Sequence, residues 1–161
     1  MRVQVLQRMR FAKPGKSLLV LAIALSIGSC SKSEGDPGVP VACKEGADSV
    51  RAALARAPAR VELDGTPLSE CFGRGADSAE LQTVGAAYVS AAATLADAAR
   101  ERPDGPEALR LGYLVGAAKR GAASTQGVHE ELMRRIEQEL IGVETASAAY
   151  RRGYEAGRSR G

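Results

Sequence analysis

The first thirty residues constrain the chain most, because they separate a targeting segment from the part that must fold. Five basic residues come before an uncharged, mostly apolar run at 17–27: Arg2, Arg8, Arg10, Lys13 and Lys16. No acidic residue precedes Cys30, which lies three residues after the run. This order is typical of a secretory signal, and the run is too short to cross a bilayer as a stable helix. We therefore expect this protein to be exported.

The last four residues of the segment, Ile27, Gly28, Ser29 and Cys30, are an aliphatic residue, two small residues and a cysteine. They resemble the lipobox of bacterial lipoproteins. In that family the cysteine is acylated, with palmitate among its acyl chains, and becomes the new N-terminus. The resemblance thus implies lipidation of Cys30, removal of 1–29, and a lipid-anchored location on the extracytoplasmic face of a bacterial membrane, inner or outer. An uncleaved anchor and an ordinary secretory signal are the alternatives.

The ten residues after Cys30 are polar and rich in glycine, proline and serine. Such a segment cannot bury a core, so we expect a flexible tether over 30–42 and a single helical domain over 43–161. Ten residues of this kind span about 17–20 Å on average. The folded domain is therefore expected to lie close to the membrane surface.

The exported part has a different charge from the whole chain. Five of the 22 basic residues and none of the 19 acidic residues precede Cys30, which leaves a net charge of −2 for the rest. This balance gives no support to nucleic acid as a partner. About 120 residues follow the tether, enough for one small domain.

The two remaining cysteines, Cys43 and Cys71, are an even pair in an oxidising compartment, which predicts a disulfide. Closing this loop would stabilise the fold by about 3–4 kcal/mol. Free thiols or a metal pair are the alternatives, but neither cysteine has a second Cys or His at ligand spacing. We therefore expect no metal site and no cofactor.

Apolar residues three and four positions apart predict helices over 47–57, 77–102, 106–124 and 128–158. The first is expected to be capped by Asp48 or Ser49. The second begins with Asp77 and Glu80, the spacing of a capping box.

The segment between the first two helices has another character. One short extended piece is expected near Val61 and Leu63, but no sheet, because no second strand candidate is present. The predicted fold class is therefore all-α: a small bundle of three or four helices with an irregular, disulfide-clipped N-terminal segment.

The third helix carries no charge over 111–118, and Gly112 with Gly116 forms a ridge of small residues. We expect a central core helix that another helix crosses closely, rather than a membrane dimer seam. Residues 124–127 then form either a turn, giving a compact bundle, or a kink within one long rod. We favour the turn, because a monomeric rod would leave its apolar stripe exposed.

Few residues suggest chemistry. His129 is the single histidine, in a sequence without the second histidine of a zinc motif, and no catalytic motif is present, so we expect neither a catalytic nor a metal site. The C-terminal stretch combines two tyrosines with four arginines: Arg151, Arg152, Arg158 and Arg160. It predicts contact with anionic lipid headgroups or an acidic polymer, and a solvated helix end is the alternative.

These features favour a lipid-anchored, non-enzymatic envelope interaction or structural module. Its expected partners are the membrane, through the lipid, and an envelope protein of unknown identity. The last helix could also pair with a second copy to form a homodimer. The alternative is a lipoprotein that binds a small ligand or ion in a pocket between Tyr88, Tyr113 and His129.

Overall fold

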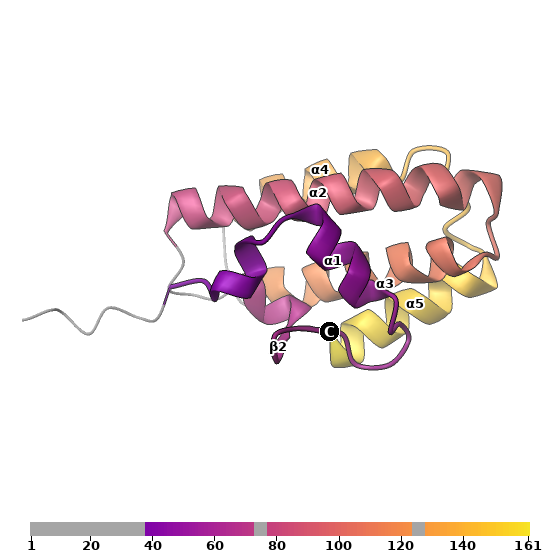
Figure 1. The fold of residues 1–161 in the computed structure, drawn as a ribbon. Helices are drawn as coiled ribbons and strands as arrows, with labels where there is room; N and C mark the ends of the chain where they lie inside the picture. The colour runs from indigo at the N-terminus through magenta and orange to yellow at the C-terminus, as the bar shows by residue number, and fades with distance from the viewer. Residues whose placement is uncertain (1–37, 73–76, 124–127) are drawn as a thin grey trace, which may run out of the picture. The chain divides into compact units, whose positions relative to one another are not determined.

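The computed structural model describes residues 38–72, 77–123 and 128–161, all of which belong to one unit. Its elements, in chain order, are η1 (Val41–Lys44), α1 (Ala47–Leu54), β1 (Glu62–Leu63), β2 (Thr66–Pro67), η2 (Leu68–Phe72), α2 (Ser78–Glu101), α3 (Pro106–Ala122), α4 (Val128–Glu139) and α5 (Ala148–Arg160) (Figure 1). Here η marks a short 3-10 helix. The two strands are only two residues each, so the predicted all-α class is confirmed, with five α-helices in the described part rather than three or four.

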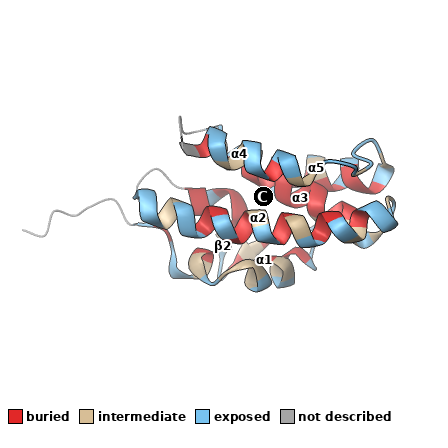
Figure 2. Ribbon diagram, turned by 90° about the horizontal axis from the view of Figure 1, so that it is seen from above, coloured by how far each residue is buried: buried red, intermediate tan, exposed pale blue. Residues whose placement is uncertain are grey.

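Helix α3 lies at the centre of this fold. Every residue of its uncharged stretch, 111–118, is buried, as the sequence predicted. It packs against α2 and η2, and it packs most extensively of all against α5. Figure 2 shows the buried residues following α3, whereas much of α4 is exposed.

The N-terminal segment is fastened to the start of α2. Asp77 caps this helix, its carboxylate accepting a 2.8 Å hydrogen bond from the Glu80 backbone N–H. The Glu80 carboxylate accepts from Lys44 Nζ at 2.8 Å and from the Val39 backbone N–H at 3.2 Å. Because Val39 is also buried, the folded domain begins before position 43, and the expected tether boundary at 42 is wrong.

The predicted disulfide is present between Cys43 and Cys71, whose Cα atoms are 5.6 Å apart. Both residues are fully buried. The bond joins η1 to η2, so it clips the N-terminal segment onto the chain just before α2.

The expectation that no sheet forms is wrong. Strands β1 and β2 pair as an antiparallel hairpin in which Glu62 faces Pro67 and Leu63 faces Thr66. Asp64 and Gly65 make the turn with φ values of 45° and 78°. Two positive φ angles are the requirement of a tight two-residue hairpin turn, which Asp-Gly meets well. Strands of two residues are too short for a periodic pattern to reveal.

The start and end of α1 also differ from the prediction. Its N-cap is Gly46, and neither Asp48 nor Ser49 caps it; Asp48 forms an ion pair with Arg51 instead. The helix ends at Leu54 rather than at 57. The chain leaves helical geometry ahead of Pro58, because the residue before a proline disfavours the α region.

The predicted single helix over 128–158 is wrong, since α4 and α5 are separate. Gly142, with φ of 78°, lies in the break, and the Ser147 hydroxyl caps α5 by accepting from the Tyr150 backbone N–H at 3.2 Å. Arg100 of α2 donates to the carbonyls of Glu139 and Ile141, at 2.8 and 2.9 Å. These bonds satisfy backbone carbonyls that α4 leaves open at its end.

Residues 124–127 themselves lie outside the described residues. Lys119 of α3 nevertheless forms a 3.0 Å ion pair with Glu137 of α4. In one continuous helix these two positions would lie about 27 Å apart. The chain therefore folds back between α3 and α4, which favours the predicted turn and rules out a single rod.

Candidate functional site

The lipobox-like residues, including Cys30, lie outside the described part of the chain, so its geometry does not bear on them. Among the helices that the structure describes, none combines the length and the apolar character needed to cross a membrane. The candidate sites described below are a groove and a basic helix face.

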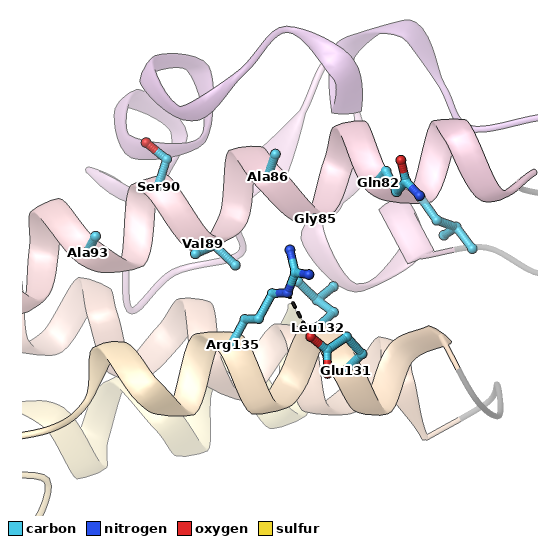
Figure 3. A pocket seen from close by; sticks show the side chains of 10 residues that line it. Gln82, Gly85, Ala86, Val89, Ser90, Ala93, Glu131, Leu132 and Arg135 are labelled. Carbon is cyan, nitrogen blue, oxygen red and sulfur yellow. Dashed lines mark hydrogen bonds and ion pairs between the residues drawn. The ribbon is translucent and has the colours of Figure 1, made fainter.

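A groove of about 740 Å³ runs between α2 and α4 (Figure 3). Its lining from α2 is apolar or small except for Gln82 and Ser90, and α4 supplies Leu132 and two charged residues. The full set is Leu81, Gln82, Gly85, Ala86, Val89, Ser90, Ala93, Glu131, Leu132 and Arg135. This composition suits an apolar occupant with a polar edge.

Gly85 of α2 faces Leu132 of α4 across the groove. A β-carbon at position 85 would lie 3.3 Å from Cδ1 of Leu132, a tight contact with the end of a flexible side chain. The Arg135 side chain extends from α4 toward α2 (Figure 3). The floor of the groove is therefore formed by Gly85 and Leu132, and its polar edge by Arg135.

Glu131, the acidic residue of the groove, is hydrogen-bonded to two arginines of its own helix. Glu131 accepts two hydrogen bonds from Arg134, at 2.9 and 2.8 Å, and one from Arg135 at 2.8 Å. The hydrogen bonds from Arg134, which have the largest effect, and from Arg135 lower the pKa of Glu131 to about 2. The carboxylate is therefore ionised at neutral pH and is poorly suited to accept or donate a proton. The groove has the character of a binding surface.

The structure does not arrange Tyr88, Tyr113 and His129 around an open pocket. The Tyr88 hydroxyl is buried and donates to the Leu68 carbonyl at 2.8 Å. The Tyr113 hydroxyl accepts from the Val61 backbone N–H at 3.0 Å. Both tyrosines have no exposed surface and fill the core, and burial raises both of their pKa values.

His129 lies in the same core, 5% exposed. The Phe72 ring contacts Tyr88 edge-on at a centroid distance of 4.7 Å and His129 at 6.0 Å. Burial lowers the pKa of His129, against a smaller opposite effect from the Phe72 backbone. In the described ranges no three His, Cys, Asp or Glu side chains gather as a metal site.

The four C-terminal arginines all lie on α5 and are exposed. Arg160 donates to the Pro58 carbonyl at 3.3 Å. The rings of Tyr150 and Tyr154 stack, with centroids 6.4 Å apart, Tyr150 buried and Tyr154 half-buried. Tyr150 therefore belongs to the core, and Tyr154 lies at its edge, rather than both forming an exposed surface with the arginines.

The glycine seam on the inner side of α5 escaped the sequence analysis. β-Carbons at Gly153 and Gly157 would lie 1.9 and 2.1 Å from the carbonyl oxygens of Leu109 and Tyr113 in α3. The spacing of these two glycines equals that of Gly112 and Gly116, so the sequence contained the signal for the second half of this close crossing.

Comparisons with models of known protein families, with curated proteins and with solved structures found no match for this chain.

Proposed function

We propose that this protein is a lipid-anchored, non-enzymatic interaction module on the extracytoplasmic face of a bacterial membrane, tethered through acylated Cys30. The observation that carries the proposal is the lipobox-like sequence at 27–30 after a signal-like segment. The buried Cys43–Cys71 disulfide supports it, because structural disulfides persist in oxidising compartments outside the cytoplasm.

The α2–α4 groove is the surface that we assign to the partner, an envelope protein. Its apolar floor favours an apolar helix or chain segment, and Arg135 and Gln82 can bond the polar edge of such a segment. The engaged Glu131 carboxylate argues against acid–base chemistry there.

A small apolar ligand is the second candidate for the groove. Its volume of about 740 Å³ lies in the range of small-molecule sites, about 300–1,000 Å³. The alternative of a ligand-binding lipoprotein therefore moves from the predicted pocket at Tyr88 to this groove.

Cell fractionation of the wild type and of a Cys30→Ala variant tests the anchor. We expect the wild type in the membrane fraction and the variant released or retained as an unprocessed precursor. A Cys43→Ala, Cys71→Ala double variant is the matched control, since it removes cysteines without removing the acylation site. Identical distribution of wild type and Cys30→Ala would overturn the proposal.

Photo-crosslinking tests the groove. A photoreactive residue at Gln82, which lines the groove, is compared with one at exposed Gln138, outside it. A protein adduct formed from 82, absent from 138 and lost with Val89→Glu supports the interaction module. An adduct of twice the chain mass identifies a homodimer. A small molecule retained by the native protein and lost with Val89→Glu supports the second candidate instead.

A further inference from the structure

The unpaired positive charge of the described part gathers around α5. Most of its basic residues form an ion pair with a carboxylate, for example Arg134 and Arg135 with Glu131. Within the described ranges six basic residues do not, and four of the six lie on α5: Arg56, Arg120, Arg151, Arg152, Arg158 and Arg160. Arg120 belongs to the same surface, because its Nη1 donates to the Ser159 carbonyl at 2.6 Å.

Helix α5 can present only one side outward. Its inner side touches the α3 backbone at Gly153 and Gly157. The opposite side carries Arg151, Arg152 and Arg158, all exposed, and Glu155 is the single carboxylate in the helix. The glycine seam therefore fixes these three arginines on the outward side, whereas Arg160, seven positions after Gly153, lies on the side of the seam at the end of the helix and is exposed there.

The C-terminal part of α5 beside Pro58 has a shape suited to a small anion. A depression of about 330 Å³ lies over Pro58, with Arg152 and Arg160 among its lining residues. Ala156 and Ser159 add little bulk there, and Glu155 is its acidic member. Two guanidinium groups beside a shallow hollow match the oxygens of a phosphate group, which arginine binds in bidentate fashion.

We infer that the α5 surface, defined as Arg120, Arg151, Arg152, Arg158 and Arg160, binds the phosphate headgroups of anionic phospholipids. The charge complementarity carries this inference, and the proposed lipid anchor directs it to a membrane rather than to a soluble acidic polymer. A short tether keeps the domain at a high local concentration of headgroups. Binding there would hold the domain with α5 toward the bilayer and leave the α2–α4 groove available to a partner.

A single-tryptophan reporter tests this orientation, because the chain contains no tryptophan. Ala148→Trp places the reporter at an exposed position of α5 outside this depression, and Thr94→Trp places a control at an exposed position of α2, which packs on α3. The membrane-extracted full protein is reconstituted into vesicles of brominated phosphatidylcholine, alone or in equal parts with phosphatidylglycerol. We expect quenching at 148, but not at 94, in the anionic vesicles only, and weaker quenching at high salt.

Two sets of substitutions distinguish an effect of the α5 surface from an effect of the net charge of the protein. Arg151→Gln, Arg152→Gln, Arg158→Gln and Arg160→Gln together should weaken the association by about 80-fold to 600-fold, at about threefold to fivefold per arginine. The matched set removes the same charge from four ion-paired residues outside both the α5 surface and the groove and should keep the quenching: Arg51, Arg102, Lys119 and Arg134 to Gln.

The inference is overturned by equal quenching in neutral and anionic vesicles, or by equal loss from both sets of substitutions. It is also overturned if soluble polyphosphate shifts the emission at 148 while anionic vesicles do not. If the protein inserts into neither kind of vesicle, the result contradicts the proposed lipid anchor instead. Cosedimentation of that protein with the same vesicles then decides the inference: binding to anionic vesicles alone supports it, and binding to neither overturns it.

Discussion

Gly153 of α5 lies so close to Leu109 of α3 that a β-carbon at position 153 would be 1.9 Å from the Leu109 carbonyl oxygen. The contact is reciprocal, since β-carbons at Gly112 and Gly116 would lie 2.1 and 2.3 Å from the carbonyl oxygens of Tyr150 and Tyr154. The two backbones therefore meet without side chains between them. Such a distance allows Cα–H···O contacts between helices.

Gly153→Ala is expected to destabilise the protein by about 3 kcal/mol, because α3 and α5 must separate to admit the methyl group. Gly85→Ala is the matched control in another helix, where the added methyl meets only the flexible end of Leu132. It should stay within about 1 kcal/mol of the wild type, helped by the higher helix propensity of alanine. Urea unfolding measures both values. Equal effects of the two substitutions would contradict the close crossing.

Removing the disulfide with Cys43→Ala and Cys71→Ala is expected to lower the free energy of unfolding by about 3–4 kcal/mol, since 28 positions separate the two residues. Denaturant unfolding of the wild type, with and without a reductant, provides the comparison. The double variant should unfold at the same denaturant concentration in both conditions. A wild type insensitive to reduction would count against the bond.

Tyr113→Phe is expected to cost about 1–3 kcal/mol, because the buried Val61 backbone N–H loses its acceptor. Tyr154→Phe is the control. Tyr154 is half-buried, and its hydroxyl makes no hydrogen bond to the residues that the structure describes, so its loss should change stability by less than about 0.5 kcal/mol. Thermal unfolding of the two variants tests the difference, and similar losses would place the Val61 bond in doubt.

His129 should make stability fall in mild acid. Burial lowers its pKa in the folded protein below 6.5, the ordinary value that applies after unfolding. The unfolded chain therefore binds more protons, so this contribution is complete above pH 6.5 and is lost as the pH falls through the folded-state pKa. The slope is at most about 1.4 kcal/mol per pH unit, the value for one proton.

Unfolding free energies of the wild type and His129→Phe across this pH range provide the test. The variant keeps a ring against Phe72 and should lack the slope. The pKa of Glu80 is held below its ordinary 4.5, chiefly by Lys44, so stability lost through this carboxyl is lost below pH 4.5 and is the same in the wild type and the variant. A slope that persists in the variant would show that another group titrates.

The parts of the fold with strong periodicity were predictable from sequence. Helix α3 followed from its uncharged stretch, and the α2 cap followed from Asp77. The last helix was predicted too long because the apolar spacing continues through Leu140 and Val143, while Gly142 and the bonds from Arg100 end α4. Those bonds come from a residue 39 and 41 positions away from the two carbonyls, a separation that local sequence patterns cannot detect.

The candidate site was predictable only in part. The arginines of α5 lie within one short stretch of the sequence, 151–160, and were predicted as a basic cluster, but which arginines lack ion pairs depends on the fold. The α2–α4 groove joins Gly85 to Leu132, two residues far apart in sequence. The pocket predicted at Tyr88 and Tyr113 does not form, because both side chains pack in the core and both hydroxyls form hydrogen bonds with backbone groups.

The intact mass of the protein extracted from membranes, alkylated with and without reduction, tests the account most directly. We predict an N-terminus at Cys30 carrying acyl chains, and two further cysteines that become alkylated only after reduction. A mass without lipid, or alkylation of Cys43 and Cys71 before reduction, would contradict the proposed anchor or the disulfide respectively.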